Sequence, residues 1–174
     1  EKARKHFKGS AIPDVYGGFS TDFTYKNFTL GVNFAYQLGG YAYDGIYQSL
    51  MSRDLQGGNA MHPDLFHAWR KPGQVTDIPS LDAGSRDYAT LTSDRFFISA
   101  SALSLKSVSL SYAFPKALCS KLRISGMNLA IAGENLLLFS KRRGLNPFDS
   151  YSGISSTPGY DVARTLTTTL NVSF

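Results

Sequence analysis

Two histidines and an aspartate lie close together near the middle of the chain, in the segment His62-Pro-Asp64-Leu-Phe-His67. Imidazole nitrogens and carboxylate oxygens are zinc ligands in proteins, but a zinc site needs three or four ligands that converge in space. The remaining histidine, His6, is far away in the sequence. We therefore interpret the segment as a polar loop motif and predict no metal site.

Hydrolysis is a second chemistry that these residues could support. A protease built on loops would use Asp64 with His62 and Asp54, and its activity would be lost in Asp64→Ala. However, the chain contains neither a Ser/His/Asp arrangement for nucleophilic catalysis nor a glycine-rich loop for phosphate. We therefore predict no enzyme, no catalytic residue and no cofactor.

Aromatic and basic residues gather in and beside the same central segment, where they could contact a substrate or a covering protein. Aromatic rings stack on sugars and are enriched at protein interfaces. The alternative is that they anchor the loop to itself and to the neighbouring strands. The candidate contact residues are Tyr41, Tyr43, Trp69, Arg70, Tyr88, Arg95 and Phe96.

The overall composition limits the class of protein. The 174 residues suit one domain, and 43% hydrophobic with 13% aromatic residues excludes a disordered chain. A net charge of +5 permits an anionic partner, but the Lys and Arg residues are scattered, so we expect no nucleic acid. The single cysteine, Cys119, excludes an internal disulfide.

Hydrophobic residues alternate with small or polar ones in several segments, and this period of two predicts β-strands. A tight connection at Lys26-Asn27 makes the first two a hairpin. The expected strands cover residues 19–25, 28–38, 103–114, 126–132 and 165–174. The third changes phase near Lys106, which predicts a β-bulge.

The expected connections differ greatly in length. Residues 115–121 form a short turn, whereas residues 39–102 and 140–164 form long loops rich in Gly, Pro, Asp and Ser. Within the first long loop we expect a short helix near residues 44–55. The antiparallel order places both short connections at one end of the sheet and both long loops at the other.

The two faces of the expected strands differ in a way that is unusual for a water-soluble sheet. One face is apolar without charges, and the other carries Ser, Thr, Gly, Asn and Ala with very few charges. A charge on the lipid face of a membrane barrel costs about 2–4 kcal/mol at mid-depth, whereas a water-filled interior accepts small polar side chains. We therefore predict an all-β transmembrane antiparallel barrel wall.

Five or six strands are too few to close a membrane barrel, since the smallest bacterial ones have about eight. Either the chain is the C-terminal piece of a longer barrel, or several copies assemble one barrel. The start of the chain, which lacks both Met and an apolar leader, favours the first alternative.

The last strand ends on an aromatic residue with apolar residues two, four and eight positions before it. This pattern resembles the C-terminal signal that the outer-membrane barrel assembly machinery reads. The residues concerned are Leu166, Leu170, Val172 and Phe174.

An ordered set of motifs covers nearly the whole chain and resembles the C-terminal third of the SusC/RagA family of TonB-dependent outer-membrane transporters. Among them are Ile12-Pro-Asp-Val-Tyr-Gly-Gly-Phe19, Phe34-Ala-Tyr-Gln-Leu-Gly-Gly40, Trp69-Arg-Lys-Pro-Gly-Gln-Val-Thr-Asp-Ile-Pro79, Gly133-Glu-Asn-Leu136 and Arg143-Gly-Leu-Asn-Pro147. Asn146 stands where the family more often has Asp.

The resemblance implies that residues 1–174 are the C-terminal portion of a barrel of about 22 strands, whose plug domain lies outside this chain. It implies a bacterial outer-membrane location with the C-terminus in the periplasm, and TonB-dependent uptake of oligosaccharides or peptides. The implied partners are the rest of the barrel and plug, TonB, membrane lipid, the glycan or peptide substrate and a SusD-like lid lipoprotein. The alternative function is a structural or adhesion barrel made of several chains, without active transport.

Overall fold

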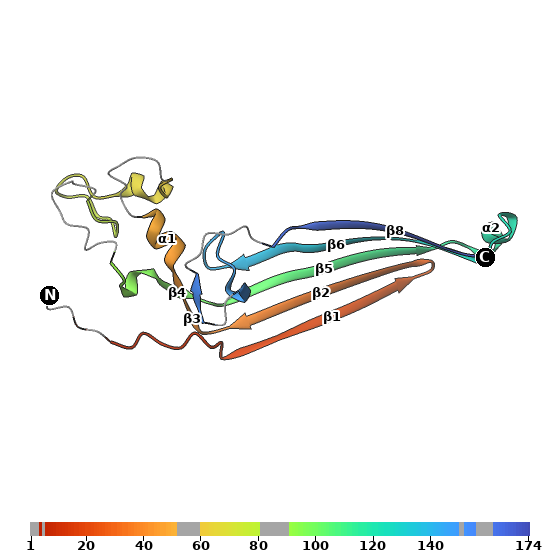
Figure 1. Ribbon diagram of the computed structural model, residues 1–174, viewed down its shortest axis with the longest axis horizontal. Helices are drawn as coiled ribbons and strands as arrows, with labels where there is room; N and C mark the ends of the chain where they lie inside the picture. Colours follow the sequence, from red (N-terminus) through yellow and green to blue (C-terminus); the bar gives the residue numbers. More distant parts are fainter. Residues whose placement is uncertain (1–3, 5, 52–59, 81–90, 150–151, 156–161) are drawn as a thin grey trace.

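The chain folds into one long antiparallel sheet with a smaller sheet and short helices at one end (Figure 1). The structure is a computed structural model, and it describes all residues except 1–3, 5, 52–59, 81–90, 150–151 and 156–161. The long sheet has the order β1-β2-β5-β6-β8. Its strands are β1 Val15–Tyr25, β2 Phe28–Leu38, β5 Ala102–Ala113, β6 Gly126–Ser140 and β8 Thr165–Ser173.

Every neighbouring pair in the long sheet is antiparallel, so the predicted hairpin and the predicted strand order are confirmed. Figure 1 shows the β1–β2 turn, the β5–β6 connection and the C-terminus at one end of the sheet. Both long loops lie at the opposite end. The predicted separation of short and long connections is therefore present, and we call the two ends the turn end and the loop end.

The bulge expected near Lys106 is present. The pairing of β5 with β2 and with β6 shifts register between Leu105 and Ser107. On the β6 side Leu137 pairs with Leu105 and Glu134 with Ser107, so residues 135 and 136 are the bulged pair. Asn135 has a φ of 53°, the left-handed conformation that Asn tolerates better than most residues.

The fourth strand is longer than the sequence predicts. Alternation is readable only as far as Ala132, because Gly133 and Asn135 take the positions where the pattern calls for large apolar residues, yet β6 continues to Ser140. The first strand is also longer, beginning at Val15 rather than Phe19. Gly17 interrupts its pattern, but a Cβ there would lie 3.1 Å from the Tyr36 hydroxyl, so the glycine leaves room for that ring.

The pairing register of the long sheet aligns residues of similar character in rows that cross all five strands. Residues that pair directly share a face of the sheet. Two neighbouring apolar rows are Tyr25–Phe28–Tyr112–Leu129–Leu170 and Phe23–Leu30–Leu110–Ile131–Thr168. The alternating rows on the other face are Thr24–Thr29–Ser111–Ala130–Thr169 and Asp22–Gly31–Ser109–Ala132–Thr167. The sheet therefore has one apolar face and one face of small, mostly neutral residues.

The connection between β5 and β6 is a helix, α2 Lys116–Lys121, where the sequence predicts only a turn. Pro115 stands just before its first residue, a position that suits the fixed φ of proline. Cys119 is a buried residue of this helix, and its thiol lies 3.8 Å from the Phe114 carbonyl oxygen.

The loop end holds the buried core of the chain. The predicted helix is present as α1 Gly45–Leu50, followed by the 3-10 helices η1 Pro63–His67, η3 Asp94–Phe96 and η4 Pro147–Asp149. A small second sheet joins β4 Phe97–Ser99, β3 Tyr41–Asp44 and β7 Ile154–Ser155 in that order. None of the helices in the described residues has the length and apolar character that crossing a membrane requires.

Candidate functional site: the loop body and the wall faces

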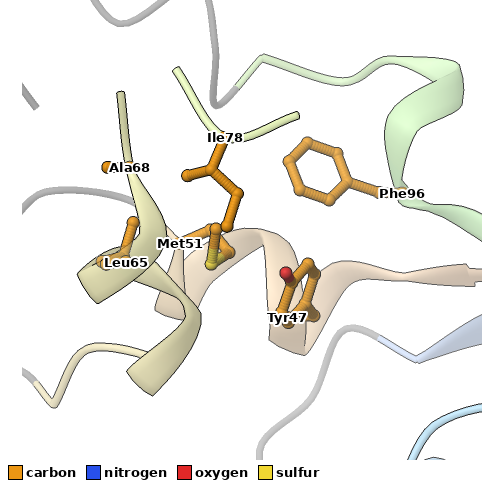
Figure 2. Close-up of a cluster of buried hydrophobic side chains, with 6 residues drawn as sticks. All are labelled: Tyr47, Met51, Leu65, Ala68, Ile78 and Phe96. Atoms are coloured by element: carbon orange, nitrogen blue, oxygen red, sulfur yellow. The ribbon is translucent and has the colours of Figure 1, made fainter. Parts of the chain in front are cut away.

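The first long loop folds around its own apolar cluster. Figure 2 shows side chains from α1, η1 and the segments before β4 pointing toward one another. The cluster consists of Tyr47, Met51, Leu65, Ala68, Ile78 and Phe96. A second cluster joins both long loops, since Leu145 packs with Ala42, Ile98 and Ala100. The two loops thus form one packed unit, which we call the loop body.

A charged side chain of the second loop reaches into the first. Asp44 is only 4% exposed and caps α1, because its Oδ1 accepts the Tyr47 backbone N–H at 2.9 Å. Its Oδ2 lies 3.2 Å from Nε of Arg142. The Arg142 guanidinium carbon also lies 3.3 Å from the centre of the Tyr47 ring, which is a cation–π geometry. Arg142 therefore pairs with a buried carboxylate and an aromatic ring at once.

Backbone pairing holds the same two loops together. Strand β3 pairs with β7 in parallel, with Tyr43 opposite Ile154. The Tyr43 N–H donates to the Gly153 carbonyl oxygen at 2.6 Å. Gly153 has a φ of 68° and its Cα faces Ala11 so closely that a Cβ would lie 2.5 Å from that residue's methyl group. Any larger residue would have to displace the segment before β1 that contains Ala11.

The hydroxyl of Tyr47 extends this network to η1. It donates to Oδ2 of Asp64 at 2.8 Å. Burial is the largest influence on this phenol and raises the pKa of Tyr47 above its usual value of 10.0. The Asp64 carboxylate acts in the same direction, whereas Arg142 acts against it by favouring the phenolate.

The His62–His67 segment is a helix cap. Nδ1 of His62 accepts the backbone N–H of Asp64 at 3.2 Å, which makes His62 the N-cap of η1. His67 is exposed, and Asp54 lies outside the described residues. In the part of the chain that the structure describes, no three His, Cys, Asp or Glu side chains are placed to hold a metal ion.

The structure places the candidate contact residues in two environments. Trp69, Arg70 and Tyr41 are exposed on the loop body, whereas Tyr43 and Arg95 are half-buried. Phe96 has 0% exposure and belongs to the apolar cluster, so it packs the loop body and offers no surface to a ligand. The seventh candidate, Tyr88, lies outside the described residues.

A cavity of about 600 Å³ opens at the loop end. It lies between the segment before β1, the loop ends of β1 and β2, and the segment that contains η4. Its aromatic walls are Tyr16, Tyr36 and Phe148, and two amides, Gln37 and Asn146, also line it. Among the described residues, the lining contains no charged side chain and none of the six candidate residues that the structure describes.

Sequence reasoning missed this cavity because its residues come from four separate segments. Gln37 is held by a bond from its side-chain nitrogen to the Ala100 carbonyl oxygen at 2.7 Å. Asn146 accepts the Phe148 N–H at 3.2 Å, which fixes the turn that presents the Phe148 ring. The Asn-Pro dipeptide at 146–147 was the one local signal of such a turn.

The apolar face of the long sheet is not covered in the way that a soluble core would be. Leu110 and Leu170 are exposed, and Phe34 is half-buried through stacking on Phe19 at 4.7 Å between ring centres. The residues of the C-terminal pattern, Leu166, Leu170, Val172 and Phe174, are all exposed along the edge strand β8 and its end.

Comparison with known proteins relates the chain to a single class. No protein-family model matches it. It is 30% identical over 158 residues to TonB-dependent receptor P39 of Formosa agariphila, covering 90% of the chain and 15% of that protein. It is 27% identical over 176 residues to TonB-dependent receptor P3 of the same organism, covering 95% of the chain and 17% of the relative.

Solved structures show the same fold. The chain superposes on the RagAB peptide importer in its open-open state with a TM-score of 0.75 and 24% identity, covering 97% of the chain and 18% of that structure's chain. For the closed-closed state the TM-score is 0.76 at the same identity and coverage.

The two-faced sheet, the separated loops and these matches define a segment of an outer-membrane transporter-type β-barrel. The chain is similar to a segment of TonB-dependent receptors over 90% of its length. It spans only 15% and 17% of the length of the two curated relatives. The relatives are named as receptors and the solved neighbours as a peptide importer, and none of these names is that of an enzyme.

Proposed function

We propose that this chain supplies C-terminal wall strands and two outer loops to a TonB-dependent importer of oligosaccharides or peptides. The observation that carries the proposal is the row register of the long sheet. It gives an apolar face for lipid and a small polar face for a water-filled interior. A sheet with two unpaired edges also needs further strands, because open edges in lipid leave backbone groups unsatisfied.

The proposed orientation of the sheet in the membrane follows from the lengths of the connections at its two ends. Outer-membrane barrels have short periplasmic turns and long outer loops. The turn end, with the C-terminus, is accordingly proposed to face the periplasm, and the loop body to face the outside. The residues of the C-terminal pattern are proposed to guide insertion by the barrel assembly machinery.

The loop body is proposed to contact the substrate or the lid. Trp69, Arg70 and Tyr41 offer exposed rings and a guanidinium, whereas Tyr43 and Arg95 are half-buried and Phe96 is buried. The cavity at the loop end, with aromatic walls and two amides, suits a neutral segment of a peptide or a glycan. Both substrate classes remain in the proposal.

The partners follow from the same proposal. A plug within the barrel and TonB would supply the energy-coupled step, and a SusD-like lipoprotein would cover the loop body. The RagAB structures that the chain resembles are those of a peptide importer. The role proposed for this chain is to hold the wall and loops in place while the plug moves.

Uptake by cells tests the function directly. Cells that produce the full receptor should accumulate a labelled oligopeptide or oligosaccharide, and a protonophore or loss of TonB should abolish the accumulation. Binding without accumulation would favour the structural or adhesion alternative. A denatured polypeptide of only 19.0 kDa in the source membrane would contradict the transporter and favour assembly from several copies.

A further inference from the structure

The side chains of the two connections at the turn end carry positive charge only. The described segments 25–28 and 113–126 contain four Lys or Arg residues and no Asp or Glu. The four cations are Lys26, Lys116, Lys121 and Arg123, and all are exposed. The loop body, in contrast, carries both signs, as the Asp44–Arg142 pair illustrates. The net charge of the chain is therefore distributed unevenly between its two ends.

The cations belong to neighbouring connections. Asn27, next to Lys26, donates from its side-chain nitrogen to the Ala113 carbonyl oxygen at 2.6 Å, and the Ala113 N–H donates back to the Asn27 carbonyl oxygen at 2.9 Å. Ala113 stands three residues before Lys116, the first residue of α2. The β1–β2 turn and α2 thus lie at the same end of the sheet, with α2 farther out (Figure 1).

Helix α2 adds an apolar stripe to this charge. Leu118 is 41% exposed and Leu122 is 55% exposed. Leu122 is the C-cap of α2, and its N–H donates to the Leu118 carbonyl oxygen at 3.2 Å, so the two leucines lie on the same side of this segment. Cys119 points the other way and is buried. An exposed leucine pair flanked by Lys116, Lys121 and Arg123 is the pattern of an amphipathic segment that lies in a membrane interface.

Aromatic rings lie at the ends of the strands next to these connections. Phe28 and Tyr112 lie 4.6 Å apart between ring centres, and Tyr112 and Phe114 lie 5.0 Å apart. The Lys26 ammonium lies 5.3 Å from the centre of the Tyr25 ring. Tyr and Trp rings concentrate at the boundary between hydrocarbon and headgroups. The four cations belong to the connections that follow these rings at the turn end.

We propose that the turn-end patch, formed by Lys26, Lys116, Lys121, Arg123, Leu118 and Leu122, docks on anionic phospholipid headgroups of the adjoining membrane leaflet. The proposal rests on the proposed function only in that the apolar face of the sheet faces lipid. Charge complementarity selects the occupant, and the leucine pair selects a bilayer over a soluble anion. The patch would fix the depth of the wall in the membrane.

Native mass spectrometry of the purified full receptor, titrated with dioleoylphosphatidylglycerol, tests the cations. Near an anionic surface each Lys or Arg contributes about fivefold in affinity. The fourfold variant Lys26→Gln, Lys116→Gln, Lys121→Gln and Arg123→Gln should bind this lipid at least about tenfold more weakly. Binding of dioleoylphosphatidylcholine should not change.

The matched control removes four exposed cations from the other end, through Lys71→Gln, Lys141→Gln, Arg143→Gln and Arg164→Gln. It should bind phosphatidylglycerol as the parent does. Equal loss in both variants, or no loss in the turn-end variant, would overturn the proposal. Displacement of the lipid by inorganic phosphate would also overturn it, because a free-anion site would then explain the charge.

A second measurement keeps all four cations in place. An environment-sensitive fluorophore attached at Leu122→Cys in the full receptor should be quenched by brominated acyl chains, and one attached at Phe66→Cys on the loop body should not. Quenching at neither position would overturn the proposal. Lipid docking and substrate uptake are read separately, so failure of one leaves the other standing.

Discussion

At the residue scale, Arg142 is the side chain on which the loop body most depends. It is the partner of a nearly buried carboxylate, and removing one member of a buried pair leaves the other charge without compensation. The Arg142 side chain is 30% exposed, so solvent reduces the cost below that of a fully buried pair.

Arg142→Gln should therefore lower the local stability of α1 by about 2 kcal/mol. Hydrogen exchange of the amides of residues 45–50 in the full receptor should accelerate about 30-fold if they exchange by local opening. Arg143→Gln, which alters the exposed neighbour, should leave this exchange unchanged. Equal protection in both variants would show that Arg142 does not join the loops.

Tyr47→Phe isolates the hydroxyl of the same network. The variant keeps the ring against Arg142 but loses the 2.8 Å bond to Asp64, so it should cost about 1 kcal/mol and less than Arg142→Gln. Hydrogen exchange of the same amides measures both variants on one scale. A larger cost for Tyr47→Phe than for Arg142→Gln would contradict the described geometry.

Tyr47 also predicts a pH dependence. Its folded pKa is raised above the unfolded value of 10.0, so between these two values the folded state binds more protons than the unfolded state. The stabilisation that this phenol provides is present below pH 10 and is lost as the pH rises through the folded pKa. A spectrophotometric tyrosinate titration should show one high-pKa tyrosine fewer in Tyr47→Phe; an unchanged titration would contradict the burial.

None of these residue contacts could be predicted from the sequence. Asp44 and Arg142 are in different loops, and an ion pair between distant segments has no local pattern. The sequence did single out Trp69 and Phe96 as important aromatics, but composition could not distinguish an exposed ring from a buried one. Which of the two rings is exposed and which is buried depends on how the first loop folds around its cluster.

At the element scale, periodicity predicted the strands well wherever alternation was continuous. Strand β2 matches its expected bounds of 28–38, because no bulge or glycine pair interrupts its pattern. The second half of β6 was missed because Gly133 and Asn135 interrupt the apolar positions of the pattern before Leu137 and Phe139 resume it. The β3–β7 pairing was missed because two-residue parallel pairing depends on the folded loops and carries no periodic signal.

A matched pair of lysine substitutions on β5 tests whether the two faces of the sheet have different surroundings. Leu110→Lys places a cation in an apolar row and should cost about 2–4 kcal/mol in lipid. Ser111→Lys places the same cation in the neighbouring polar row and should cost much less. The fraction of full receptor that reaches the folded, heat-modifiable form in outer membranes measures both, and equal loss would contradict the two-faced wall.

The C-terminal pattern predicts an assembly defect. Phe174→Ser should slow insertion of the full receptor, because it removes the aromatic end of the signal proposed for β8. Ser173→Ala, one residue earlier, should not. Pulse-chase analysis of the folded form measures the rate; normal insertion of Phe174→Ser would remove Leu166, Leu170, Val172 and Phe174 from the list of assembly determinants.

At the scale of the whole molecule, the chain is a wall with a packed loop body at one end. Strands β1 and β8 are the edges of the long sheet, so the polar groups along their outer sides require neighbours from the rest of a barrel. The buried clusters lie in the loop body and not against the sheet faces. Such a fold has its apolar surface where lipid, and not protein, would cover it.

Single-cysteine labelling of the full receptor in native membranes tests this arrangement most directly. Cysteines at positions 110 and 170 represent the apolar rows, and cysteines at positions 111 and 169 represent the polar rows of the same strands. The first pair should resist a water-soluble maleimide and carry fluorophores that nitroxide lipids quench, whereas the second pair should react with the maleimide and escape quenching. Reaction of the first pair with protection of the second would contradict the proposed wall.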